Sequence, residues 1–340
     1  MEGDVVTVRK RQNYALHSLT GIILIVLTGV KFNMGSVSQE GLLALGRFAM
    51  PFFFIISGYY LFSDDGHSEK ALPRKIKHIL GIIIIVKLTF LALDVIYYFA
   101  GIVTMDYLIK AFVTSEATTM HVWFVYALFL LYIWWFLMIR YNLNIKRISW
   151  IASTVVLVLS LFFGVVIRGF GIDDIGGVST LYINEIIYPF IGIPFFTIGY
   201  YLHMYHDEFD KRFGTGTLIA LTIIGAVLPF LTSVTIPSST LYFGSILTSV
   251  GLFMLTFRVP ENRFRCRATE FIGRSLKPFL YMFFPAVVFF MQNVGLKWLR
   301  YNAVAYAAIG AFASILANLL LSYSVYRAII HFRRPRPTSA

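Results

Sequence analysis

Long apolar runs separated by short polar segments extend along the whole chain. A helix needs about 20 apolar residues to cross the hydrocarbon core of a bilayer, which is about 30 Å thick. In lipid, every backbone N–H and C=O must be paired within the protein, which favours helices over open strands for such runs. The pattern predicts an all-α, polytopic membrane protein with about ten transmembrane helices, at about 14–32, 42–62, 79–100, 122–140, 149–166, 184–204, 215–233, 242–257, 278–295 and 303–325.

Composition agrees with this pattern. Of the 340 residues, 58% are hydrophobic and 14% are charged, whereas about 25% of the residues of a soluble domain are charged. The chain therefore has too little polar surface to coat a water-soluble globule. No repeat or Pro- and Ser-rich linker interrupts it, so we expect one transmembrane domain over residues 1–340. No small-residue cleavage site follows the first apolar run, which predicts an uncleaved first helix.

The basic residues set the orientation. The net charge is +12, and most Lys and Arg residues fall in alternate loops. Because cytoplasmic loops are enriched in Lys and Arg, this alternation places both termini in the cytoplasm. The positive charge is thus a topology signal that also favours contact with anionic membrane lipid. We expect a multi-pass protein of the cytoplasmic (inner) membrane that binds no nucleic acid.

Neither a metal centre nor a soluble-enzyme motif is evident. The single cysteine, Cys266, excludes a disulfide framework and a multi-cysteine metal site. His203 and His206 are three residues apart but lack a third ligand at suitable spacing, so we interpret them as solvated loop histidines and expect no metal. The chain has no phosphate loop, nucleophile elbow or metalloprotease helix.

Charged residues inside membrane helices are costly and are candidate site residues. Lys87 lies near the middle of the third predicted helix and Asp94 in its outer third, seven residues apart and on one face. The pair is interpreted either as a substrate or proton site or as a structural ion pair. Arg47 lies near the outer end of the second helix. His121 and Glu185 begin the fourth and sixth helices at similar depth.

Several of these residues belong to longer blocks. The first reads Arg47-Phe-Ala-Met-Pro-Phe-Phe-Phe-Ile-Ile-Ser57-Gly-Tyr59-Tyr-Leu, and the second begins His121-Val-Trp123-Phe. Two further blocks span residues 188–200 and 272–285. Together they resemble the membrane-bound acyltransferase family 3, which includes polysaccharide O-acetyltransferases, and the membrane half of vancomycin-resistance serine racemases.

The resemblance implies transfer of an acyl group, most simply acetyl, from cytoplasmic acyl-CoA to a glycan or lipid-linked acceptor outside. It implies no metal. The implied catalytic residues are Arg47, which would bind the acceptor or the acyl oxygen, and His121, which would be the general base. The expected substrate-binding residues are Thr28, Trp123, Asp94, Lys87, Glu185 and Ser57, and the expected cofactor-binding residues are His17 and Tyr59.

The first helix departs from the family pattern. The family has an arginine, ten residues and then a histidine, and the corresponding positions here are His17 and Thr28. In the ninth helix, Phe284 stands where the family has a histidine before proline. Two hypotheses therefore stay open: an acyltransferase that uses His121 as its base, or a non-catalytic carrier in which Lys87 and Asp94 serve translocation.

Overall fold

The computed structural model describes residues 13–32, 48–62, 67–101, 103–106, 123–162, 170, 174–175, 178–179, 190–235, 243–258, 266–297 and 303–333. These residues form helices, apart from short connections and one antiparallel pair of two-residue strands, β1 (Asp174–Ile175) and β2 (Val178–Ser179). The all-helical expectation is confirmed to this extent. The chain forms two compact units, residues 1–35 with 256–340 and residues 36–255.

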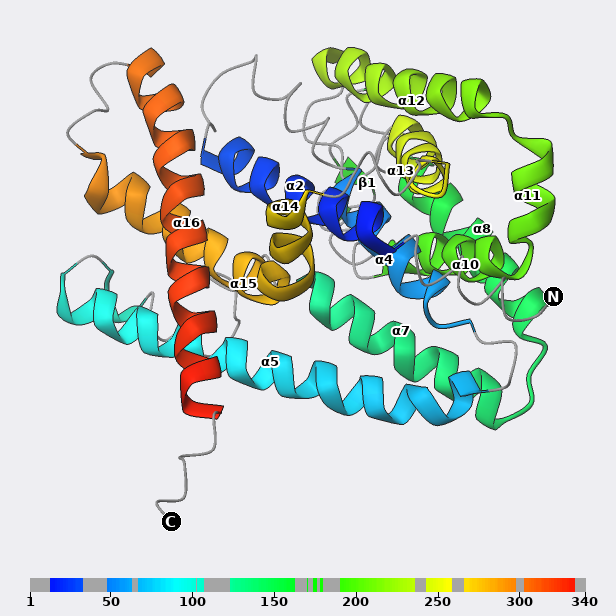
Figure 1. The fold of residues 1–340 in the computed structure, drawn as a ribbon, viewed down its shortest axis with the longest axis horizontal. Coiled ribbons are helices and arrows are strands. Elements are labelled where there is room, and N and C mark those ends of the chain that lie inside the picture. Colours follow the sequence, from blue (N-terminus) through cyan, green and yellow to red (C-terminus); the bar gives the residue numbers. More distant parts are fainter. Residues whose placement is uncertain are drawn as a thin grey trace. The chain divides into compact units, whose positions relative to one another are not determined.

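The first unit joins the two ends of the sequence. Its elements are α2 (Asn13–Phe32), α14 (Arg267–Phe271), η5 (Ile272–Leu276), α15 (Lys277–Phe290), η6 (Met291–Gly295) and α16 (Ala303–Arg333). The first of these, α2, packs against α14, η5, α15 and α16, and α15 also packs against α16 (Figure 1). The helical segment from Arg267 to Gly295 includes two π-helical stretches, η5 and η6.

Small residues bring α2 close to α14 and η5. A Cβ atom on Gly21 would lie 2.8 Å from the carbonyl oxygen of Thr269, and one on Gly273 would overlap the carbonyl oxygen of His17. Such close backbone approach is the usual role of glycine between membrane helices. In the same unit, the buried Asn318 donates from Nδ2 to the carbonyl oxygen of Leu280 at 3.2 Å, which links α16 to α15.

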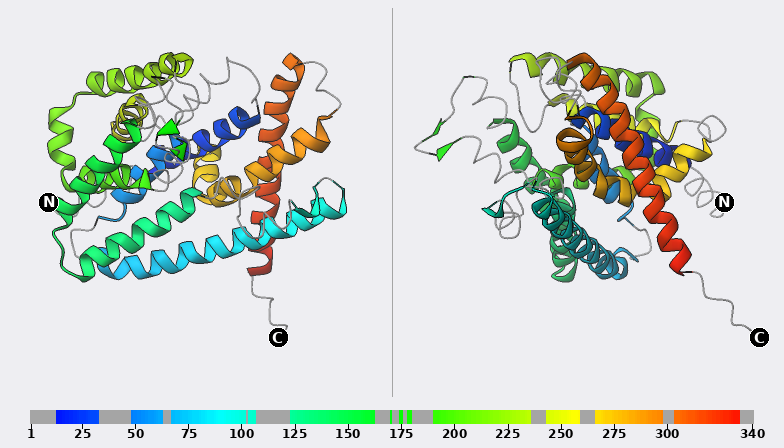
Figure 2. Two further views of the ribbon diagram at one scale, coloured as in Figure 1. Left: turned by 180° about the vertical axis from the view of Figure 1, so that it is seen from behind. Right: turned by 90° about the vertical axis from the view of Figure 1, so that its left-hand side faces the viewer.

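The second unit contains the remaining described helices. Its elements are α4 (Ala49–Tyr59), α5 (His67–Phe99), α7 (Trp123–Arg140), α8 (Ile145–Leu161), α10 (Gly192–Met204), α11 (His206–Arg212), α12 (Thr215–Thr235) and α13 (Phe243–Leu255). Here α4 packs against α10 and α13, α5 runs beside α7, and α12 packs on α13 (Figures 1 and 2). The core of this unit is strongly aromatic, with Phe52, Phe54, Trp135, Phe196 and Phe253 fully buried.

Glycines on both partners set the crossing of α4 and α10. A Cβ atom on Gly58 would overlap the carbonyl oxygen of Phe196, and one on Gly199 would overlap the carbonyl oxygen of Ile55. Both obstacles are backbone atoms, which cannot rotate away. The two helices therefore meet backbone to backbone at this crossing.

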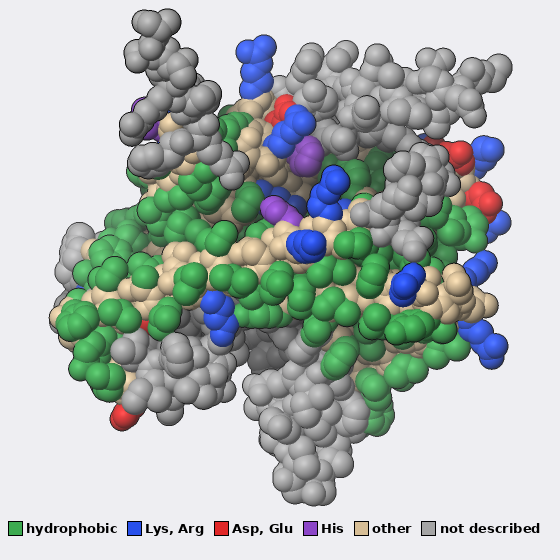
Figure 3. Space-filling view, turned by 90° about the horizontal axis from the view of Figure 1, so that it is seen from below, with side chains coloured by type: hydrophobic (Ala, Val, Ile, Leu, Met, Phe, Trp, Pro, Cys, Tyr) green, Lys and Arg blue, Asp and Glu red, His purple; other side chains and the backbone are tan. Residues whose placement is uncertain are grey.

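The exposed surface is apolar over wide areas, as Figure 3 shows for one face. Among the described residues, three helices are long and apolar enough to cross a membrane: Ala71–Phe99, Arg267–Gly295 and Ile309–His331. The pair His206–Arg212 and Thr215–Pro229, bent by 91°, gives a fourth if it counts as one span. Four shorter apolar helices accompany them, at 16–26, 49–59, 124–140 and 244–255.

Several helix boundaries differ from the apolar runs. The largest difference is in α5, which begins at His67 rather than near residue 79. Hydropathy identifies only the part of a helix that suits lipid, so it omits the polar first turns of α5. Similarly, α16 continues to Arg333, eight residues past its expected end at 325.

Candidate functional site

His203 packs beside the C-terminal end of α4. Its Nδ1 lies 2.9 Å from the carbonyl oxygen of Tyr59. Its ring centroid lies 4.5 Å from that of Tyr59 and 4.9 Å from that of Phe62. The interpretation of His203 as a solvated loop histidine is therefore wrong: it is half-buried and bridges α10 and α4. The ring of Tyr59 is itself buried, with 4% exposed.

A lysine from α5 meets the same helix end. The Nζ of Lys75 donates to the carbonyl oxygen of Tyr60 at 3.0 Å and lies 5.7 Å from the ring centroid of Tyr132. The last carbonyls of a helix lack partners within it and favour a cation nearby. The second distance is in the range of a cation–π contact. Lys75 and His203 thus bond to backbone carbonyls at the C-terminal end of α4.

Ser57 lies near this end of α4. Its hydroxyl donates to the carbonyl oxygen of Phe53 at 2.9 Å and pairs with the hydroxyl of Tyr132 on α7. Among the predicted site residues, the structure thus gathers Ser57 and Tyr59 at one end of α4. It adds an imidazole, a phenol and an ammonium group around them.

His17 occupies a second polar cluster, in the other unit. Its carbonyl oxygen accepts a hydrogen bond from Thr20 Oγ1 at 2.8 Å and faces Gly273. The cationic side chains of Arg274 and Lys277 lie within electrostatic range of its ring. Arg274 also lies 3.7 Å from the carboxylate of Glu270. The half-buried His17 ring is therefore in a positively charged environment, next to the π-helical stretch η5.

Lys87 and Asp94 lie on α5 as expected. Asp94 is buried, with 2% exposed, and interacts electrostatically with Tyr97, whereas Lys87 is half-buried. Seven residues of α-helix separate two Cα atoms by about 10 Å, which is long for a direct ion pair. The buried face of α5 contains Asp94, so this carboxylate belongs to the protein interior rather than to a lipid-facing surface.

The other predicted site residues have no described side chains. Arg47, His121 and Glu185 lie outside the described residues. Thr28 lies within α2 and Trp123 is the first residue of α7, but the structure does not describe their side chains. The roles of these five residues stay predictions.

Sequence reasoning missed Lys75, Tyr132 and the two cations beside His17. The spacing of Lys75 from its apolar neighbours could have indicated its burial. It is three residues after Leu72 and four before Ile79, and both of these are buried. Extending the helical period from the apolar run back through 67–78 would have placed Lys75 on the packed face.

Comparison with known proteins gives one clear result. A family model described as an acyltransferase domain matches residues 15–323, which includes helices of both units. No curated protein and no solved structure matches the chain significantly. Since the family model covers far more than half of the sequence, the chain belongs to the membrane acyltransferase family 3.

Proposed function

We propose that the protein transfers an acyl group, most simply acetyl, from cytoplasmic acyl-CoA to a cell-envelope glycan or lipid-linked acceptor at the outer face. The family match over residues 15–323 is the observation that carries this proposal. The proposal includes about ten spans, given the core thickness of a bilayer, in one functional domain over residues 1–340 of the cytoplasmic membrane, with both termini in the cytoplasm.

The chemistry needs a base and a site for the acyl oxygen. The acceptor oxygen attacks the thioester carbonyl carbon, the C–S bond breaks, and CoA leaves as its thiolate or thiol. The proton of the acceptor hydroxyl must move to a nearby base. His121 takes that role, because the ordinary pKa of histidine, about 6.5, suits proton transfer near neutral pH. Arg47 binds the acceptor or stabilises the acyl oxygen.

The donor carries phosphate groups and therefore favours a cationic site. The pair Arg274 and Lys277 beside His17 supports donor binding in the first unit, since both cations lie in electrostatic range of the imidazole. His17 is a cofactor-binding residue in this proposal, and Tyr59 lies at an inner helix end. Thr28, Ser57, Lys87, Asp94, Trp123 and Glu185 are proposed to line the acceptor and acyl path.

The test is release of CoA by the purified protein with a panel of acyl-CoA donors and glycan acceptors. His121→Ala should lower turnover by about 10²-fold or more, the usual contribution of a general base. His78→Ala, which removes an exposed histidine on α5, is the matched control and should be neutral. Normal turnover in His121→Ala would eliminate its proposed role.

A second candidate is a carrier without catalysis, favoured by the threonine at the position of the family's first-helix histidine. Under the transfer proposal, Thr28→Val should cost less than about tenfold in rate, since a net hydrogen bond contributes about 1 kcal/mol. Under the carrier hypothesis, no acyl-CoA and acceptor pair releases CoA, and Thr28→His creates weak turnover. Robust CoA release by the unmodified protein would exclude the carrier.

A further inference from the structure

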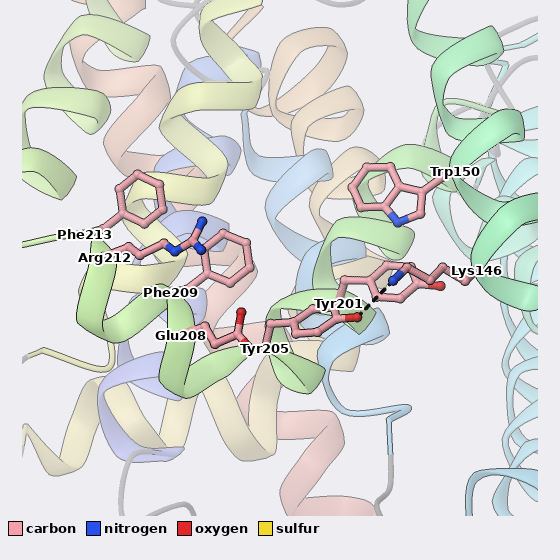
Figure 4. A pocket seen from close by; sticks show the side chains of 8 residues that line it. All are labelled: Lys146, Trp150, Tyr201, Tyr205, Glu208, Phe209, Arg212 and Phe213. Atoms are coloured by element: carbon pink, nitrogen blue, oxygen red, sulfur yellow. Dashed lines mark hydrogen bonds between the residues drawn. The ribbon is translucent and has the colours of Figure 1, made fainter.

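A pocket of about 400 Å³ lies where α8, α10 and α11 meet in the second unit (Figure 4). One wall is a row of nearly parallel rings. Trp150 stacks on Tyr201 with centroids 5.5 Å apart and planes at 21°, and Tyr201 stacks on Tyr205 at 6.2 Å and 19°. The opposite side contains Phe209 and Phe213, stacked at 5.9 Å and 14°. The pocket therefore offers flat, apolar surfaces on two sides.

Charged side chains accompany these rings. Lys146 donates from Nζ to the hydroxyl of Tyr205 at 3.2 Å and lies 5.7 Å from the centre of that ring. Arg212 and Glu208 line the pocket from α11, and all three charged side chains are exposed. In Figure 4, Lys146 and Arg212 lie on opposite sides of the pocket. The formal charge of the lining is +1, which suits a singly charged phosphodiester.

The helices around the pocket continue into apolar surfaces. α11 and α12 are bent by 91° at the pocket. Beyond this bend, α12 carries Ile219, Ile223 and Leu231, whose side chains are 45–58% exposed. From the other side, α8 exposes Ile151 and Val158 at 54% and 58%. Two helices with exposed apolar side chains thus start at one cationic, aromatic pocket.

Aromatic residues and cations together are typical of the depth at which lipid headgroups lie. If α12 crosses the bilayer, the 91° bend makes α11 lie along its surface, so the pocket is at headgroup depth. We propose that this pocket binds the headgroup of a phospholipid, with the phosphate between Lys146 and Arg212. The glycerol and first acyl carbons then lie on the rings and along the exposed apolar side chains.

This assignment is independent of the acyl-transfer chemistry, although the proposed topology fixes the leaflet as the cytoplasmic one. Glu208 refines the expected selectivity. Its carboxylate accepts a hydrogen bond from a headgroup hydroxyl, as in phosphatidylglycerol, or from an ammonium group. The quaternary ammonium of phosphatidylcholine has no such donor. Phosphatidylglycerol should therefore bind more tightly than phosphatidylcholine.

The test measures binding of phosphatidylglycerol to the detergent-purified full chain by native mass spectrometry. The double variant Lys146→Ala/Arg212→Ala should weaken the tightest binding event by tenfold or more. The matched control Arg147→Ala/Lys211→Ala removes the same charge from the adjacent exposed positions, and it should change that affinity by less than threefold. Equal losses in both variants would overturn the proposal, because they would indicate general electrostatic attraction.

Two further experiments identify the ligand. Glu208→Leu removes the hydrogen-bond acceptor for the glycerol hydroxyl, so it should reduce the preference for phosphatidylglycerol over phosphatidylcholine, and an unchanged preference would contradict the assignment. The nucleotide part of CoA also carries phosphates and a planar ring. Displacement of phosphatidylglycerol by 3′,5′-ADP from the unmodified protein, at equal concentrations, would overturn the lipid assignment and identify the pocket as a nucleotide site. Retention of the lipid supports the proposal.

Discussion

The crossing of α4 and α10 makes a sharp test of the packing described above. Gly58→Ala adds one methyl group directly against the carbonyl oxygen of Phe196, and Gly199→Ala adds one against that of Ile55. Neither oxygen can rotate away, so the helices must separate or shift along each other. Such a displacement alters the packing along the whole crossing.

The magnitude follows from the large side chains that pack around this crossing. Phe52, Phe54, Ile55, Phe195 and Phe196 are all fully buried there. In lipid the attraction between helices is mainly dispersion, and a gap of about 0.5–1 Å removes a quarter to a half of each atom pair's attraction. Over-packing of cores costs about 1–3 kcal/mol. Because the obstacle is backbone and several large side chains share the gap, we expect about 3 kcal/mol for each variant.

The assay is thermal unfolding of the purified protein in detergent, followed by intrinsic fluorescence. A loss of about 3 kcal/mol should lower Tm by about 4 °C for a chain of this size. Gly81→Ala is the matched control, since a Cβ atom there has no neighbour within 4 Å and the position lies within α5. That variant should leave Tm unchanged or raise it, because alanine favours helix over glycine. Equal Tm values for Gly58→Ala and Gly81→Ala would refute the backbone-to-backbone crossing.

Four further predictions concern single side chains. The exposed Cys266 should react with an impermeant maleimide in inverted vesicles but not in intact cells, and labelling of intact cells would overturn the proposed orientation. Hydrogen bonds from the backbone and side chain of Thr269 lower the pKa of the Cys266 thiol. Its alkylation rate should therefore reach half-maximum at a lower pH than that of a free cysteine, and an equal or higher midpoint would exclude this effect. His203→Phe keeps an aromatic ring beside Tyr59 and Phe62 but loses the hydrogen bond to α4. It should therefore lower stability by about 1 kcal/mol in thermal unfolding, and His203→Ala should cost more. Asn318→Leu removes the bond to Leu280 and should also cost about 1 kcal/mol, and an unchanged Tm would show that this bond contributes nothing.

The sequence predicted the helical class and the family because both depend on patterns that extend over the whole chain. Apolar runs of span length and the Arg47 and His121 blocks needed no tertiary information. The predicted placement of Asp94 within a membrane helix agrees with its burial on α5. The environment of His17 was less accessible, since Arg274 and Lys277 are more than 250 residues away in sequence.

The failures have a common physical cause. A hydropathy window treats polar residues at helix ends as loop, so His203 was interpreted as solvated and Lys75 was not considered as a packed residue. Both instead bond through their nitrogen atoms to backbone carbonyls at the end of α4 and lie beside aromatic rings. The bend between α11 and α12 was invisible for a related reason. Its residues are polar whether they form a loop or a surface helix, and only tertiary packing decides between the two.

The close packing of α2 on η5 also imposes an order on biosynthesis. The partners of Gly21 are Thr269 and Gly273, which the ribosome adds long after α2 ends at Phe32. At about 5–20 residues per second, α2 waits about 10–50 s for them. During that interval the first helix must persist in the membrane, or in contact with the insertion machinery, without its final neighbours. Assembly of the first unit is therefore necessarily a late event, completed only when the C-terminal helices arrive.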